Sequence, residues 1–298
     1  MRHWKARWGI VLLVALGLVA LSTTAQASSK PTLHVGNPSG LVPPRGGKGK
    51  PVRGSNKLLV WHNGAVLASG AAVTAIYWGP KWANSSFAGD KVSGLQTFYQ
   101  GVGGSNYANT NTEYTDSSGQ VSSAVSYSGK VTDLTSTPSG APSTSQVATV
   151  VANNVKSPSP NGFYAVYSDI PRGNAGYCAW HSWGTINGVL TQFGFFFSLD
   201  GDPGCDPGDT SGKHSQGLAA LANVSGHELS ETLTDPDGGG WFAHSGDENA
   251  DECAWTFGHP LLTFKNGSQW RVQGNWSNNA FSAGTSYLGS GSGCIDGS

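Results

Sequence analysis

One stretch, Ser225–Asp237 with the sequence S-G-H-E-L-S-E-T-L-T-D-P-D, constrains this chain more than any other. An apolar run lies just before it, so residues 215–234 are predicted to form one packed helix. Side chains four residues apart share a face of a helix, which places His227 beside Glu231, with Glu228 on the flank of the same face. The sequence therefore predicts one imidazole and two carboxylates gathered on a packed helix.

The spacing H-E-x-x-E is a variant of H-E-x-x-H, in which two side chains bind zinc and the glutamate is a general base. A carboxylate is an acceptable zinc ligand, though harder than imidazole. We therefore expect His227 and Glu231 to bind a metal and Glu228 to act as the base. The alternative is a chance match on an exposed helix. Only 12% of the chain is charged, and the carboxylates that gather here favour the metal: Glu228, Glu231, Asp235, Asp237, Asp247, Glu248, Asp251 and Glu252.

The end of the predicted helix offers candidates for a third ligand. Pro236 cannot continue a helix and biases Asp235 away from helical conformation. Asp235 and Asp237 therefore stand where the chain turns away, followed by three glycines. Asp237 lies ten residues after His227, the offset of the third ligand in H-E-x-x-H-x-x-G-x-x-H, although Thr234 takes the place of the glycine. Both aspartates are candidate metal ligands.

The N-terminus predicts export. A basic start at residues 1–8, an apolar run over 9–21 and an A-x-A cleavage site at 25–27 indicate that residues 1–27 are a secretory signal peptide. The apolar run is too short to cross a bilayer comfortably. Residues 28–56 are rich in Pro, Gly and basic side chains and are expected to be a disordered linker or a pro-region. The mature protein is predicted to be extracellular and free of the membrane.

Charge and cysteine content narrow the class further. A net charge of −1 and a pI near 6.7 argue against a nucleic-acid partner, which would require a basic face. Secretion makes two disulfides the default for the four cysteines, and no C-x-x-C pair occurs. Of the three connectivities, Cys178–Cys205 with Cys253–Cys294 is preferred because each bond closes a moderate local loop. The spacing alone leaves the other two open.

Residues 57–298 are expected to form a single domain of the α/β (α+β) class. Strands and helices alternate first, and the late part is β- and loop-rich. This order favours a mixed β-sheet with packed helices, on which the motif helix follows the sheet as in zincins. Order is expected to begin at residues 58–61. The ranges expected as strands are 71–78, 163–168, 191–198, 253–257 and 269–273, with strands and turns over 107–131. The ranges expected as helices are 87–101, 146–156 and 215–234.

Several short segments resemble the EXORDIUM-like, or phosphate-induced protein 1, family of secreted proteins, in a bacterial-type form. Residues 64–68 with 73–82 are similar to the opening segment of that family, and C-A-W-H at 178–181 is similar to its C-G-x-H-G segment. N-V-S-G-H with T-D-P, and E-N-A-D-E-C at 248–253, look like the helix and the E-x-x-D-x-C segment that bacterial-type members keep. The resemblance covers roughly residues 60–298. It implies a metal site in which Asp251 is a further ligand.

The same resemblance leaves the activity open, because the plant members are associated with cell-wall growth signalling and have no established enzyme activity. His181 and Trp180 stand in the segment C-A-W-H-S-W and are expected to line a substrate cleft. For His181 the alternative is a packed, hydrogen-bonded position in the core. A serine hydrolase is not supported, since there is no G-x-S-x-G elbow. One histidine among many carboxylates also suits calcium, which prefers oxygen ligands.

We therefore expect a secreted zinc-dependent metallohydrolase, with peptide or protein substrates. The alternative is a non-enzymatic extracellular protein with a structural zinc or calcium site, which binds cell-wall components or peptides.

Overall fold

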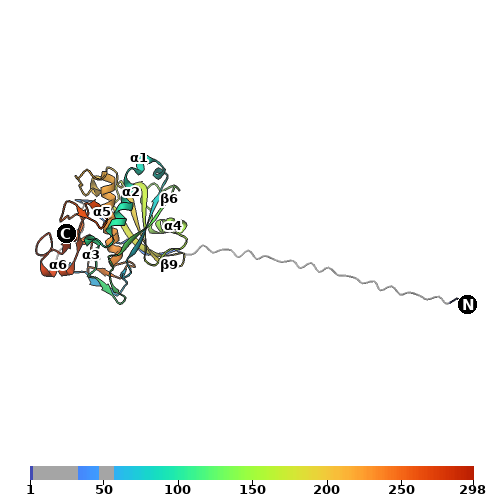
Figure 1. Cartoon of the computed structure of the whole chain (residues 1–298), viewed down its shortest axis with the longest axis horizontal. Helices are drawn as coiled ribbons and strands as arrows, with labels where there is room; N and C mark the ends of the chain where they lie inside the picture. Colours follow the sequence, from blue (N-terminus) through green and yellow to red (C-terminus); the bar gives the residue numbers. More distant parts are fainter. Residues whose placement is uncertain (3–32, 47–56) are drawn as a thin grey trace. The chain divides into compact units, whose positions relative to one another are not determined.

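A six-stranded mixed sheet is the framework of the chain from Leu33 onward (Figure 1). The computed structural model describes residues 1–2, 33–46 and 57–298, so the predicted signal peptide lies almost wholly outside the described residues. The strands are ordered β1 (His34–Val35), β8 (Ala179–Ile186), β9 (Val189–Ser198), β7 (Gly162–Pro171), β3 (Ala71–Trp78) and β6 (Val125–Asp133). β9, β7, β3 and β6 are parallel neighbours, whereas β8 runs antiparallel to β9 and β1 antiparallel to β8.

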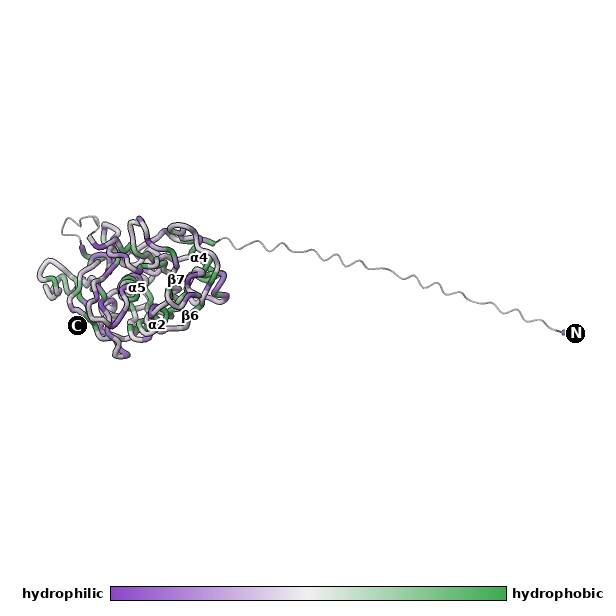
Figure 2. Tube along the Cα trace, turned by 90° about the horizontal axis from the view of Figure 1, so that it is seen from above, coloured by the Kyte–Doolittle hydropathy of each residue, from purple (hydrophilic) through white to green (hydrophobic). Residues whose placement is uncertain are grey.

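The central strands are apolar along nearly their whole length because helices cover both faces of the sheet. α2 (Lys91–Val102) and α5 (Gln216–Thr234) lie on one face, and α4 (Thr144–Asn154) lies on the other (Figures 1 and 2). A buried chain of hydroxyls joins the layers: Tyr167 Oη of β7 lies 2.7 Å from Tyr99 Oη of α2 and 2.8 Å from Ser225 Oγ of α5. The motif helix is thereby fixed against the middle of the sheet.

The remaining elements are short and form the loops and the late part of the chain. They are β2 (Val60–Trp61), η1 (Pro80–Ala83), α1 (Ser85–Ala88), α3 (Asn106–Asn109), β4 (Thr115–Asp116), β5 (Gly119–Gln120), η2 (Pro203–Cys205), β10 (Trp241–Phe242), η3 (Asp251–Cys253), β11 (Leu262–Thr263), β12 (Gln269–Trp270), β13 (Asn275–Trp276), α6 (Asn278–Ala283) and β14 (Cys294–Ile295). The 3-10 turn η3 carries Asp251 towards α5.

The structure confirms the predicted mixed sheet with packed helices. β3 has the predicted bounds, and the helix predicted over 146–156 begins two residues earlier because Ser143 caps it with a capping box. The strand expected over 253–257 is wrong. Local backbone bonds from Cys253 to Ala250 and from Thr256 to Cys253 form a 3-10 turn and a further turn there instead.

The prediction that residues 28–56 are disordered is wrong for residues 33–46, which we call the N-terminal strap. Its backbone pairs with β8, and Val42 is fully buried. The prediction failed because this segment has no row of apolar side chains. Main-chain hydrogen bonds and the close approach of its glycines attach it to the domain instead. Residues 28–32 and 47–56 lie outside the described residues.

Both preferred disulfides are present, Cys178–Cys205 and Cys253–Cys294, and all four cysteines are buried. Such bonds are typical of proteins in an oxidising environment. Among the residues that the structure describes, no helix is long and apolar enough to span a membrane.

The disulfides close loops of different length, which predicts different losses of stability. Replacing Cys253 and Cys294 by serine, 41 residues apart, is expected to lower the free energy of unfolding by about 4 kcal/mol. The pair Cys178 and Cys205, 27 residues apart, is expected to lose about 3.5 kcal/mol. Urea unfolding of the two double variants measures both. Losses below about 1 kcal/mol would show that chain entropy is not what these bonds restrict.

Candidate metal centre

α5 owes its position to a cap at each end and to burial along its length. At the start, Ser215 Oγ accepts a hydrogen bond of 3.1 Å from the amide of Leu218. At the end, the amide of Asp235 donates to the carbonyl of Glu231, and Pro236 follows. Every residue from Gly217 to Thr234 is buried. The charged side chains of this helix therefore lie inside the protein and need partners there.

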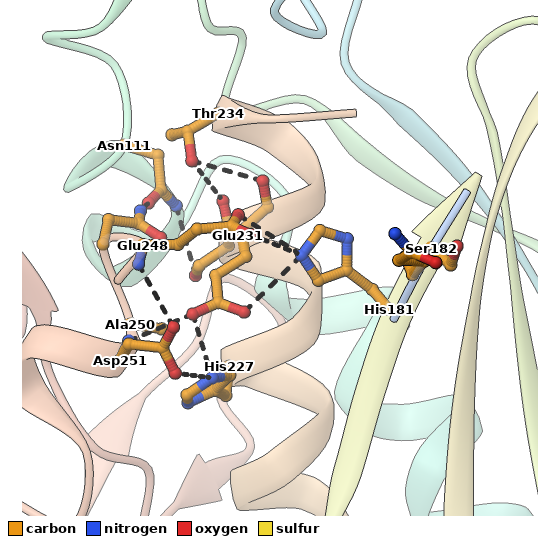
Figure 3. Close-up of polar contacts among 12 residues, drawn as sticks. Asn111, His181, Ser182, His227, Glu231, Thr234, Glu248, Ala250 and Asp251 are labelled. Atoms are coloured by element: carbon orange, nitrogen blue, oxygen red, sulfur yellow. Dashed lines mark hydrogen bonds and ion pairs between the residues drawn. The ribbon is translucent and has the colours of Figure 1, made fainter. Parts of the chain in front are cut away.

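Two carboxylates, those of Glu231 and Asp251, lie on one side of His227 (Figure 3). An amide lies on its other side. Its Nε2 lies 2.9 Å from Glu231 Oε1 and 3.4 Å from Asp251 Oδ1. Its Nδ1 lies 2.8 Å from Nε2 of Gln273, which also donates to the carbonyl of Ala250 over 2.9 Å. The ring is thus oriented so that Nε2 faces the carboxylates, as in sites where an outer hydrogen bond orients a metal-binding histidine.

A second imidazole reaches the same carboxylate from the sheet. His181 projects from β8 towards α5, and its Nε2 lies 3.7 Å from Glu231 Oε2 and 3.3 Å from Glu248 Oε2 (Figure 3). Glu231 therefore lies between two histidines, one for each oxygen. The backbone closes the arrangement, because the amide of Asp251 donates to Glu231 Oε1 over 3.0 Å and the amide of Glu248 donates to Asp251 Oδ2 over 3.1 Å.

Two overlapping sets of side chains have the close spacing that a metal ion requires. One set is His227, Glu231 and Asp251, and the other is His181, Glu228 and Glu231. In each set, one ligand atom from every residue lies within 4.8 Å of the others. A buried His/Glu/Asp group that could hold a metal ion is therefore present, with Glu231 shared between the two sets.

Burial raises the pKa of the carboxylic acids in this group, because charge is costly away from water. It raises the pKa of Glu231 to about 8, and those of Glu228 and Glu248 well above the usual 4.5. Burial also lowers the pKa of His181. For His227 burial again lowers the pKa, but the charge of Glu231 and the ion pairs with Glu231 and Asp251 together raise it well above 6.5.

Unpartnered buried atoms show that these residues fit a cation. Both oxygens of Glu228 have no hydrogen-bond partner, nor do Oε2 of Glu231 and of Glu248, and Nε2 of His227 makes no such bond either. The ion pairs found for this group within residues 33–46 and 57–298 involve histidines and no Lys or Arg. Buried carboxylates are normally paired or bound to a metal. Imidazole with carboxylates is a donor set that suits zinc, and the oxygen-rich part also suits calcium.

The structure brings together only some of the residues predicted from the sequence. His227, Glu228, Glu231 and Asp251 meet at one place. Asp235 instead accepts a bond of 2.6 Å from the amide of Gly240 and stabilises the turn after α5. Asp237 faces the strap, in a pocket that it lines with His34, Val35, Gly36, Asn37, Ser39, Trp183 and Gly238. Neither aspartate belongs to the two sets described above.

The side chains of His181 and Trp180 point to opposite faces of the sheet, because neighbouring residues on a strand do so. His181 faces the carboxylates. Trp180 is 1% exposed and packs against Phe193 and Phe195 in the core, so the expectation that it lines a cleft is wrong. Sequence reasoning did not assign Glu248 and Gln273 to this site. Glu248 begins the E-x-x-D-x-C segment, which is a usable signal, but nothing around Gln273 marks it.

Comparison of the chain with protein-family models, with curated proteins and with solved structures finds no match.

Gln273 offers a test of the metal centre that leaves every candidate ligand intact. Gln273→Leu removes the amide that orients His227, and outer-shell changes of this kind typically weaken metal binding by about 10- to 100-fold. Zinc affinity is measured by competition with a chelating dye. Gln269→Leu on β12, whose side chain bonds to Thr263, is the matched control and should leave affinity unchanged. Equal affinity in Gln273→Leu and the wild type would contradict this role.

The pKa shifts predict how the pH acts on the metal-free protein. A carboxylic acid whose pKa is raised on folding favours the folded state below its unfolded pKa and loses that contribution as pH rises through its folded pKa. For Glu231 the window runs from 4.5 to about 8. Glu228 and Glu248 act in the same direction, and His181 opposes them. The melting temperature in excess chelator should therefore fall from pH 5 to pH 8.

Differential scanning fluorimetry across this range provides the measurement. Added zinc should raise the melting temperature more at pH 8 than at pH 5, because the ligands must be deprotonated to bind it. Glu231→Gln, a neutral side chain of the same shape, should flatten the decline. A metal-free protein that becomes more stable towards pH 8 would contradict the assignment.

Proposed function

We propose that the protein is a secreted zinc-dependent metallohydrolase that acts on peptide bonds. The observation that carries this proposal is the pairing of two features on α5. His227 and Glu231 form a buried set with Asp251, and directly beside them Glu228 has two buried oxygens without a hydrogen-bond partner. The first three would hold the ion, which leaves Glu228 free for proton transfer.

In this proposal each residue has a distinct task. Bound zinc supplies a Lewis acid that polarises the scissile carbonyl and lowers the pKa of a water molecule. Glu228 would accept a proton from the attacking water and would give it to the leaving nitrogen. Gln273 keeps His227 oriented throughout, and Glu248 and His181 flank Glu231.

Two features support the extracellular part of the proposal. The protein has two disulfides, which are typical of proteins in oxidising compartments. Its N-terminal sequence predicts a signal peptide. The resemblance to bacterial-type EXORDIUM-like proteins agrees with the site, since its E-x-x-D-x-C segment contains both Glu248 and Asp251. We therefore propose membership of that family.

The donor set favours one alternative. Carboxylates outnumber imidazoles around Glu231, and such oxygen-rich shells suit calcium in a structural role. In that case the protein would be an extracellular binding protein for peptides or cell-wall components. An enzyme needs an open metal position beside Glu228, and a structural site does not.

Metal analysis of the purified protein by mass spectrometry decides between the two. We expect one zinc per chain in the wild type and in His244→Ala, an exposed histidine outside the cluster, and none in His227→Ala. Calcium in place of zinc, or equal metal in all three proteins, would refute the proposed enzyme. Two zinc ions per chain would assign the second set, with His181, as a ligand set too.

Glu228→Gln tests the chemistry separately from metal binding. Glutamine keeps the shape but cannot accept the proton, so zinc content should stay at the wild-type level. Hydrolysis of a quenched fluorescent peptide library should fall by about 10²- to 10⁴-fold. Turnover at the wild-type rate would exclude Glu228 as the general base.

A further inference from the structure

The N-terminal strap runs antiparallel along β8, beside the candidate metal centre. His34 and Val35 pair with Thr185 and Gly184. The pairing resumes at Ser39, whose amide donates to the carbonyl of His181 over 2.8 Å and whose carbonyl accepts from the amide of His181 over 3.1 Å. The strap thus forms hydrogen bonds with the same residue that reaches Glu231.

Further bonds attach the strap on both sides of Ser39. The carbonyl of Asn37 accepts from Ser182 Oγ over 3.0 Å, and the carbonyl of Val42 accepts from the amide of Cys178 over 2.7 Å. Beyond it, the carbonyl of Pro43 accepts from the indole of Trp255 over 2.7 Å. The strap therefore covers the edge of β8 over nearly its full length.

Gly40 brings the strap directly against the metal centre. A β-carbon at this position would lie 1.7 Å from Glu231 Oε2 and 2.7 Å from His181 Cδ2, so only glycine fits. Its φ of +54° also favours glycine. The backbone of the strap consequently blocks the approach to the oxygen of Glu231 that faces His181.

This inference rests on the function proposed above. We propose that the strap is an intramolecular inhibitor that occupies the substrate-binding site. Substrates are then extended peptides that pair with β8 after the strap leaves. Extended peptides add to exposed sheet edges through main-chain bonds, and pockets then select side chains. Without the strap, β8 is such an edge. The position of Gly40 predicts that the substrate residue facing Glu231 is glycine.

The covalent link explains why the strap would prevail over a free peptide. A tethered segment acts at an effective concentration in the millimolar range, which exceeds that of most peptide substrates. Apparent activity is then reduced in proportion to the small fraction of open molecules. Release of the strap is therefore the step that would control hydrolysis.

Gly40→Ala in the full chain tests the inference, because the added methyl group cannot be accommodated against Glu231. Gly46→Ala is the matched control: it also has a positive φ, of +72°, but a β-carbon there meets nothing within 4 Å. We expect Gly40→Ala to hydrolyse the peptide library about tenfold faster than the wild type, since more molecules are open. Gly46→Ala should match the wild type.

A second measurement does not depend on hydrolysis. A fluorescent synthetic peptide of residues 33–46 should bind to the Gly40→Ala protein, whose own strap is displaced, and not to the wild type. The same peptide carrying Gly40→Ala should bind neither. Fluorescence anisotropy reports the binding, and thermal melting shows that each variant is folded.

The outcomes separate this inference from the function on which it rests. Peptide binding by Gly40→Ala together with faster hydrolysis supports inhibition by the strap. If the wild type and Gly40→Ala both bind zinc and hydrolyse the peptide library at equal rates, the inference is overturned and the proposed enzymatic function stands. Zinc absent and hydrolysis absent in every variant would overturn both, and peptide binding would then mark the strap as a purely structural strand.

Discussion

The burial of several carboxylates around one helix is the constraint on which the rest of the structure depends. Ionised groups leave water at a high cost unless an opposite charge or good hydrogen bonds receive them. Here α5 carries His227, Glu228 and Glu231 into the interior. Glu248 joins them from the loop before η3, and Asp251 joins them from η3 itself. Two imidazoles and a few backbone amides are too few partners for these oxygens. A metal ion, which this group could hold, would supply the missing positive charge.

The surrounding elements serve that centre from different parts of the chain. β8 supplies His181, the end of β12 leads to Gln273, and the disulfide Cys253–Cys294 fixes the turn that holds Asp251. None of these segments is adjacent to α5 in sequence. The site is therefore as much a product of the sheet topology as of the helix that carries its motif.

Local patterns in the sequence were sufficient for the parts of the fold that depend on neighbouring residues. The helical spacing of His227 and Glu231 and the apolar runs of the central strands were predicted. The disulfide pairing that the structure has was preferred from loop length, but the spacing left two other pairings open. The third carboxylate was harder, because it depends on the path of the chain after Pro236. Asp235 accepts a hydrogen bond from Gly240 in the turn after α5, while Asp251 returns to the cluster from a distant turn. Contacts such as Gln273 with His227 span 46 residues, and no periodicity encodes them.

The pairing of the strap with β8 has a consequence for solubility. A sheet edge with unpaired amides and carbonyls is a template on which other chains assemble, and natural proteins cover such edges. β6 is the outermost strand on one side of the sheet, and the strap, which contains β1, is outermost on the other side. Release of the strap would open the metal centre to substrates but would also expose the edge of β8, which lowers the colloidal stability of the protein. The released form would be short-lived in concentrated solution, where copies meet edge to edge before they meet anything else.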